Sequence, residues 1–319
     1  MHFLLRRFLR SLCLLVGVSF LSFLLLDLAP GDYFDSMRLD PNISPDTVKA
    51  IRAQYGLNRP LPEEYLSWVR SLCRGDWGYS LAYNLPAAQM IWQRAGYTLL
   101  LSGAATALAW ISALVLGLWA AAHRNTWIDA LVQGLEALLM AVPELVLALL
   151  LLLIAVWTGL APSGGATSPA TTALDRPQAW DVLRHLLLPC LCLAAGLLPL
   201  LLLHVRSSIG QALDSPFSEA ARGYGISPKR LLLRHALPVA ANPLITLFGL
   251  SIGLLMSSSL VTETIFSWPG IGSLMVNAIV ERDFFVVVDC TLLSGIFLLA
   301  GNFVADLLLY IHDPRVRSS

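Results

Sequence analysis

Long apolar stretches alternate with polar segments along the whole chain. Six of them stand out, at about residues 12–28, 98–121, 135–157, 186–204, 244–261 and 286–311. An α-helix needs about 20 mostly apolar residues to cross the hydrocarbon core of a bilayer, and each stretch is close to that length. The pattern therefore predicts an all-α integral membrane protein with six transmembrane helices and with both termini on the same side.

The first apolar stretch follows Arg6, Arg7 and Arg10, so it has the outline of a secretory signal. The stretch is longer than a signal core of roughly 7–15 residues, and no small-x-small cleavage site follows it. We therefore expect an uncleaved transmembrane helix over residues 1–30, ended by Pro30-Gly31-Asp32.

Residues 31–96 form the longest polar region and are expected to fold as an extracytoplasmic loop domain. Ser44-Pro45 is a helix start signal, and that helix is predicted to run to Gly56. Pro62-Glu63-Glu64 opens a second helix that is predicted to stop near Gly75. The region is thus predicted to be a large helical loop after the first span.

Basic residues set the expected orientation. Eleven of them lie at the two ends and in the short links after the second and fourth stretches, against three, Arg176, Arg184 and Arg282, in the short links of the other face. Short cytoplasmic loops collect positive charge, so both termini are predicted to be cytoplasmic. A five-helix transport domain would then cover 97–312, with a cytoplasmic coupling segment at 205–238 and a tail at 313–319.

Two carboxylates in apolar surroundings are candidates for a transport path. Glu144 follows Pro143, which is expected to kink the third span, and a kink with a carboxylate can present polarity to a cavity. The alternative, a glutamate solvated near the cytoplasmic interface, fits the sequence equally well. Glu263, near the external end of the fifth span, is a weaker candidate because such groups often only reach the interface.

A short apolar segment follows the fifth span. Pro269, Gly270 and Gly272 precede a run over residues 273–279, and this order predicts a re-entrant or interfacial helix. Irregular backbone at membrane depth is tolerated only where it is buried in protein or lines a cavity.

The segment from Ser215 to Pro238 is the most polar and basic one between two long apolar runs. Ser215-Pro216 and Ser227-Pro228 both combine a capping side chain with a proline suited to a helix's first turn. Gly225 lies between them, where a left-handed residue would stop the first helix. Two short helices separated by a sharp turn are predicted, and the first is too short to span a bilayer.

This segment resembles the EAA signature in permease subunits of bacterial ABC importers. The matching residues are Glu219-Ala220-Ala221, Gly225 and Pro238, and Arg234-His235-Ala236-Leu237 narrows the likeness to the peptide and nickel branch. The resemblance implies that the short helix docks in a groove of an ATP-hydrolysing subunit and carries its motion to the membrane helices. The residues implied in this coupling are Glu219, Ala220, Ala221, Tyr224, Gly225 and Pro228.

Further landmarks resemble the same family. They are the run Gly56–Leu61 with Tyr65, Trp68 and Gly75–Ser80, the stretch Thr262–Gly272, and Asp313-Pro314-Arg315. In that family the long loop faces the extracytoplasmic solute-binding protein, so Tyr65, Trp68 and Trp77 are implied on that face. A helical lid that packs on its own membrane domain explains any single one of these aromatic residues equally well.

The composition and the motifs favour a membrane protein that catalyses no reaction itself. Hydrophobic residues make up 56% and charged residues 13%, against about 25% charged in soluble domains. There is no Gly-Lys pair for a phosphate-binding loop, and no basic and aromatic stripe for nucleic acid. Cys190-Leu191-Cys192 lies in an apolar run, where buried small side chains are expected rather than a metal site. No catalytic, cofactor-binding or metal-binding residues are predicted.

The resemblance implies a multi-pass subunit of the bacterial cytoplasmic membrane, which imports peptides, nickel or a metallophore. Its implied partners are a second permease, two subunits that bind the ATP, and an extracytoplasmic binding protein. An ion-coupled secondary transporter is the alternative, but no related halves are visible in the sequence. A membrane-embedded hydrolase would need a nucleophile or metal cluster within the spans, and the sequence contains neither.

Overall fold

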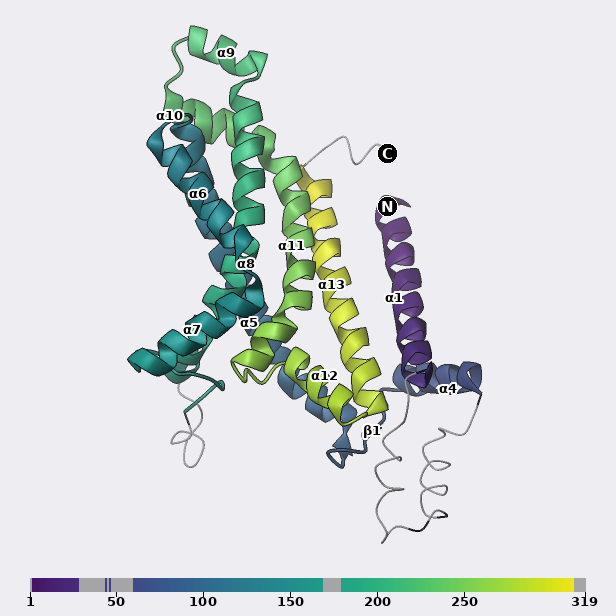
Figure 1. Cartoon of the computed structure of the whole chain (residues 1–319). Coiled ribbons are helices and arrows are strands. Elements are labelled where there is room, and N and C mark those ends of the chain that lie inside the picture. Colours follow the sequence, from purple (N-terminus) through teal and green to yellow (C-terminus); the bar gives the residue numbers. More distant parts are fainter. Residues whose placement is uncertain (1, 29–43, 45, 47–59, 169–178, 313–319) are drawn as a thin grey trace. The chain divides into compact units, whose positions relative to one another are not determined.

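The computed structural model describes residues 2–28, 44, 46, 60–168 and 179–312. The chain divides into two compact units. Unit 1 contains Met1–Leu5, Leu99–Trp268 and Leu298–Ser319, and unit 2 contains Arg6–Thr98 and Pro269–Phe297. The two units are described separately below, with the element labels of Figure 1.

Unit 2 is built from helices and one small hairpin. It holds most of α1 (His2–Leu28), α4 (Leu61–Cys73), the paired strands β1 (Tyr79–Ser80) and β2 (Leu85–Pro86), the beginning of α5 (Ala87–Ala122), α12 (Ile271–Val280) and the beginning of α13 (Phe284–His312). The helix predicted from Pro62 to Gly75 is confirmed as α4, and Gly75 follows it with a φ of +84°. The short apolar helix predicted after the fifth span is confirmed as α12. The helix predicted from Ser44 to Gly56 lies almost wholly outside the described residues.

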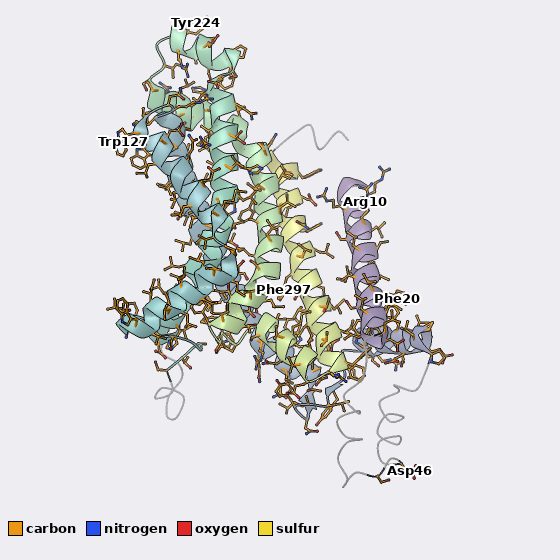
Figure 2. The ribbon with its side chains drawn as sticks, viewed as in Figure 1. Arg10, Phe20, Asp46, Trp127, Tyr224 and Phe297 are labelled. Atoms are coloured by element: carbon orange, nitrogen blue, oxygen red, sulfur yellow. The ribbon has the colours of Figure 1, made fainter. Side chains whose placement is uncertain are left out.

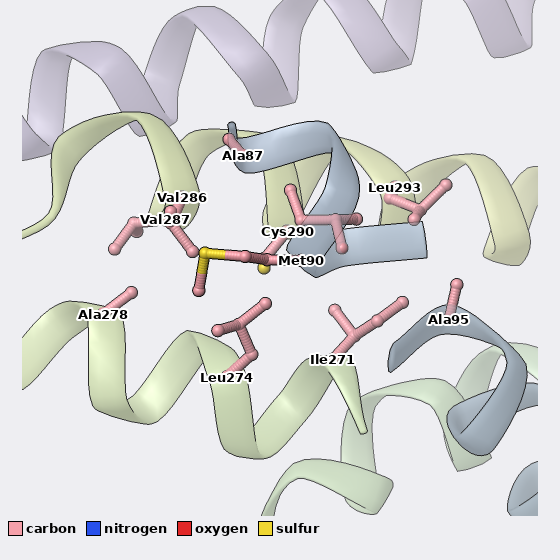
Figure 3. Close-up of a cluster of buried hydrophobic side chains, with 11 residues drawn as sticks. Ala87, Met90, Ala95, Ile271, Leu274, Ala278, Val286, Val287, Cys290 and Leu293 are labelled. Carbon is pink, nitrogen blue, oxygen red and sulfur yellow. The ribbon is translucent and has the colours of Figure 1, made fainter. Parts of the chain in front are cut away.

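The core of unit 2 joins α5, α12 and α13. Met90 of α5 lies between Leu274 of α12 and Val286 of α13 (Figure 3). A second cluster packs Phe23 of α1 and Trp68 of α4 against α13. Helix α4 of the external loop is therefore anchored on α1 and α13 through buried apolar side chains.

Unit 1 contains the remaining helices. They are the rest of α5, α6 (Trp127–Ala141), α7 (Glu144–Thr158), α8 (Ala179–Leu213), α9 (Pro216–Gly223), α10 (Pro228–Leu231), the π-helical turn η1 (Leu232–Ala236), α11 (Leu237–Ile265) and the end of α13. The long helix α8 packs against α11, α6 and α7, so it forms the centre of this unit. It also continues to Leu213, which makes the first part of the predicted segment 205–238 an extension of the fourth span.

Five helices in the described part of the chain are long and apolar enough to cross a membrane. They are Leu9–Leu28, Ala87–Ala122, Ala179–Leu213, Pro228–Leu255 and Phe284–Ile311. The sixth span is reached only if α6 and α7 count together, because these helices are bent by 97° at a short break. The expectation of one kinked helix over 135–157 is therefore wrong in detail.

The break between α6 and α7 follows from Pro143. The residue before a proline is disfavoured in the helical region, and Val142 is extended with φ −95° and ψ 115°. Pro143 itself has ψ 141°, so two successive residues leave the helical conformation before Glu144 starts α7. A proline inside a continuous helix would have produced a smaller bend.

Glycines let α11 and α13 approach closely within unit 1. A Cβ atom at Gly249 would lie 2.3 Å from Cβ of Ala305, and one at Gly301 would lie 2.5 Å from Cγ2 of Ile252. Gly249 and Gly253 are spaced as in the small-xxx-small pattern of membrane helix pairs. Tight backbone packing thus joins α11 to α13.

Candidate functional site

The short helix α9 is attached to the end of α8 by serine side chains. Ser218 is fully buried, and its Oγ donates a hydrogen bond of 2.7 Å to the carbonyl of Ala212. Oγ of Ser215 donates to the same carbonyl at 2.6 Å. The predicted helix over 216–224 is confirmed, but the predicted side-chain caps are wrong, because neither Ser215 nor Ser227 caps its helix. Ser215 uses its hydroxyl to satisfy the end of α8 instead.

The other end of α9 is closed by Gly225. Its φ is +76°, in the left-handed region that favours glycine. The amide of Gly225 donates to the carbonyl of Arg222 at 2.9 Å, and the amide of Ile226 donates to that of Ala221 at 3.1 Å. These two bonds form a Schellman motif, so the predicted left-handed stop at Gly225 is confirmed.

The surface of α9 away from α8 is open. Tyr224 is 88% exposed, and Phe217, Glu219 and Ala220 are also exposed. Figure 2 shows Tyr224 at the tip of α9, pointing away from the rest of unit 1. Small side chains beside two exposed aromatic rings give a surface that another protein can approach closely.

A widened helical turn follows α9. Pro228 starts α10, and the chain then passes through η1 into α11 without leaving the helical conformation. The amide of Leu237 reaches back to the carbonyl of Leu232, one residue further than in an α-helix. Pro238 comes next and has no amide hydrogen, so the wider turn relieves the clash that its ring would cause.

Three helices of unit 1 meet at the break that Pro143 causes. Glu144, the first residue of α7, accepts a hydrogen bond of 2.8 Å from Oγ1 of Thr262 on α11. On α8, Gly196 lies beside this carboxylate, since a Cβ there would be in ordinary van der Waals contact with it, 3.8 Å from Oε2 of Glu144. Glu144 is half-buried, so it is held inside the unit rather than extended into water.

Glu263 follows Thr262 in α11 and is completely buried. Its backbone carbonyl accepts a hydrogen bond of 2.8 Å from the amide of Trp268. The side chain of Glu263 is therefore enclosed by protein within unit 1. Pro143, Glu144 and Glu263 are brought to one region, since Glu263 adjoins the residue that binds Glu144.

The aromatic residues of the external loop pack inward to different degrees. Trp68 is 5% exposed, and its Nε1 donates to Oδ1 of Asp289 at 3.1 Å. Tyr65 is half-buried, and its hydroxyl is 2.9 Å from Oγ of Ser19 on α1. Trp77 packs partly on the core of unit 2 and against the ring of Trp92. Trp68 thus holds α4 in place and has little surface left for a partner.

A buried polar contact in unit 2 was not anticipated from the sequence. Oγ of Ser80 donates a hydrogen bond of 2.5 Å to Oδ2 of Asp283, and the amide of Ala82 donates to the same oxygen at 3.2 Å. The pKa of Asp283 is raised above its usual value because the effect of burial outweighs the opposite effect of these hydrogen bonds. The contact joins the end of the run Gly75–Ser80 to the start of α13. The spacing of about 200 residues between the partners hides it from any local pattern.

Two family models together match nearly the whole chain. Residues 113–318 match the family described as "Binding-protein-dependent transport system inner membrane component". Residues 1–101 match "Binding-prot-dependent transport system membrane comp, N-term".

Curated relatives cover nearly the full length. A putative peptide permease protein of Brucella ovis is 36% identical over 321 residues, with 99% of both chains covered. The oligopeptide transport system permease protein AppB of Bacillus subtilis is 33% identical, with 98% of both covered. The dipeptide transport system permease protein DppB of Escherichia coli is 29% identical, with 99% of both covered.

Proposed function

Because this chain belongs to the family of binding-protein-dependent transport system inner membrane components, we propose that it is a permease subunit of an ATP-driven peptide importer. The full-length likeness to peptide permeases favours peptides over nickel or a metallophore as the substrate. Membership of this family also argues against the alternative function, an ion-coupled secondary transporter. The chain itself is a multi-pass inner membrane protein, and ATP is bound by separate subunits.

The observation that carries this proposal is the construction of α9. The helix is fixed at one end by Ser218 and at the other by Gly225, while Tyr224 is left open to a partner. In this assignment Glu219, Ala220, Ala221, Tyr224, Gly225 and Pro228 form the docking surface for an ATP-binding subunit. Closure of the paired ATPases on ATP would displace α9 and exchange an inward-facing for an outward-facing cavity.

The transport path is proposed to pass the region of Pro143, Glu144 and Glu263. A carboxylate at the break of a membrane helix offers a charge to the terminal amine of a peptide or to a cationic side chain. The hydrogen bond from Thr262 supports this role, because it holds the carboxylate within the protein. Glu144 is then a determinant of preference among peptides.

The remaining partners follow from the family. They are a second permease subunit and an extracytoplasmic binding protein, with both termini of this chain in the cytoplasm. The binding protein is proposed to dock on unit 2 near Trp77, while Tyr65 and Trp68 support the docking surface by fixing α4 on α1 and α13.

Reconstitution of the complete complex in proteoliposomes tests the proposal. The chain is combined with a second permease, two ATP-binding subunits and an extracytoplasmic binding protein. We expect import of a labelled di- to pentapeptide that requires both ATP and the binding protein. Import that continues without ATP and follows an ion gradient would refute the assignment.

A further inference from the structure

We propose that Arg206 is the residue through which displacement of α9 reaches the broken span α6–α7. The proposal rests on the proposed function and names one positioning residue within it. Arg206 lies in the last turns of α8, shortly before Ser215 and the start of α9. Figure 1 shows α6 beside this part of α8 within unit 1.

The guanidinium group of Arg206 is held between two carboxylates of α6. Nη1 donates to Oδ1 of Asp129 at 3.2 Å, and Nη2 lies 3.9 Å from Oε2 of Glu136. Asp129 and Glu136 are two helical turns apart, so they lie on the same face of α6. Arg206 therefore contacts both ends of this face with one planar group.

Burial distinguishes this contact from an ordinary surface ion pair. The side chain of Asp129 is 7% exposed and that of Arg206 is 26% exposed. The other oxygen of Asp129 accepts a hydrogen bond of 3.3 Å from the amide of Asn125, just before α6. Water and salt screen such a contact much less than an exposed one, so it can link α8 to α6.

A nearby ion pair provides the contrast. Arg124 donates to Asp214 beside the same part of α8, but both side chains are more than half exposed. Both pairs line one hollow of about 280 Å³, bordered also by Ser207, Gly210 and Gln211. Exposed pairs contribute little to holding two helices together, so the pair of Arg124 and Asp214 is a suitable control.

The connection continues from α6 to the candidate transport path. α6 ends at Ala141, and two extended residues join it to Glu144 of α7. Extended residues between two helices can absorb a change in φ and ψ, so they can serve as a hinge. A pull on α6 at Asp129 would therefore alter the 97° bend, while the hydrogen bond from Thr262 holds Glu144 on the other side of the break.

The test measures how many ATP molecules the reconstituted complex hydrolyses per peptide imported. In Arg206→Gln we expect this ratio to rise about tenfold, which corresponds to about 1.4 kcal/mol of lost coupling between α8 and α6. In Arg124→Gln we expect a change of less than about twofold. An unchanged ratio in Arg206→Gln, with normal import by the unmodified complex, would overturn this inference and leave the proposed function intact. A failure of the unmodified complex to import peptides would instead refute the proposed function.

Two further variants separate coupling from simple structural support. The exchange Arg206→Asp with Asp129→Arg restores the ion pair, so it should bring the ratio back toward that of the unmodified complex. If Arg206→Gln fails to accumulate in the membrane, Arg206→Lys carries the test, because it keeps the charge but loses the planar fork. A normal ratio in the lysine variant would then overturn the proposal.

Discussion

Thr262 of α11 donates a hydrogen bond of 2.8 Å to the carboxylate of Glu144, the first residue of α7. The first backbone amides of a helix are unpaired and favour a negative charge, so Glu144 is doubly supported there. Cys192 of α8 lies beside the same contact, 3.9 Å from Oγ1 of Thr262. This carboxylate is the group that we propose binds a cationic part of the transported peptide.

The first prediction concerns the charge of Glu144. Glu144→Gln keeps the size and the hydrogen bonding but removes the charge, so import of a lysine-containing peptide should fall relative to a neutral one. A lost charge-assisted contact predicts a change of about tenfold in their ratio. Competition between the two labelled peptides in proteoliposomes measures it.

The control for this prediction is Thr262→Val, which removes the hydrogen bond but keeps the carboxylate. It should preserve the preference for the cationic peptide even if total import falls. An unchanged ratio of the two peptides in Glu144→Gln would show that the carboxylate is structural.

The second prediction concerns the left-handed turn after α9. Gly225→Val places a β-branched residue at a φ of +76°, which costs about 1–3 kcal/mol and reorients the docking helix. Peptide import and the ATP hydrolysis that accompanies it should fall together, while the protein remains in the membrane. Both rates are measured on the same reconstituted complex.

Gly223→Ala is the matched control, because a Cβ there meets nothing within 4 Å and its φ is not left-handed. It should leave both rates close to those of the unmodified complex. Full activity of Gly225→Val would contradict the role assigned to this turn.

Local sequence patterns predicted α4, α9 and α12 well, because each is bounded by strong signals. Pro62, Pro216 and Gly270 mark their first turns, and Gly75 and Gly225 mark two of their ends. These signals act through backbone conformation, which depends on near neighbours.

Contacts between distant residues were not predictable in the same way. Pro143 indicated an interruption, but the bend of 97° depends on how α6 and α7 pack on α8. Trp68 was expected on an external face, but it is buried in the core of unit 2, where it donates a hydrogen bond to Asp289 and contacts the ring of Phe23. From the sequence, Arg206 is only one of the basic residues that follow the fourth apolar stretch, because its partner Asp129 is remote in sequence.

The third prediction separates two roles of Glu219, which is exposed in the first turn of α9. As a local partner of the helix N-terminus it contributes about 0.3–1 kcal/mol. Glu219→Gln should then weaken binding of the ATP-binding subunits by no more than about threefold. Truncating a buried interfacial ion pair would cost about 2–5 kcal/mol and weaken binding at least tenfold.

We favour the local role, because Ala220, Ala221 and Tyr224 offer a docking surface that needs no charge. Ala221→Leu should therefore weaken the complex more than Glu219→Gln, since a larger side chain prevents close approach. The affinity of each detergent-solubilised variant for the ATP-binding subunits decides between the two roles of Glu219. A larger loss of affinity in Glu219→Gln than in Ala221→Leu would support an ion pair.

The fourth prediction concerns topology. Cys73 is exposed at the end of α4 and should react with a membrane-impermeant maleimide added to intact cells. A cysteine introduced at Ser227, in a Cys73→Ser background, should react only after the cytoplasmic side is opened. Labelling of both positions from outside would contradict the six-span arrangement with cytoplasmic termini.

The central claim is that α9 docks on an ATP-binding subunit, and photo-crosslinking at Tyr224 tests it most directly. Tyr224, directly after α9, and Trp157, in the last turn of α7, are both 88% exposed. Figure 1 shows α9 and α7 at opposite ends of unit 1. A photoreactive phenylalanine analogue at 224 should crosslink to the ATP-binding subunit in a yield that changes when ATP is added, while the same analogue at 157 should not. Equal yields at the two positions, or no crosslink from 224 in a complex that imports peptide, would contradict the account.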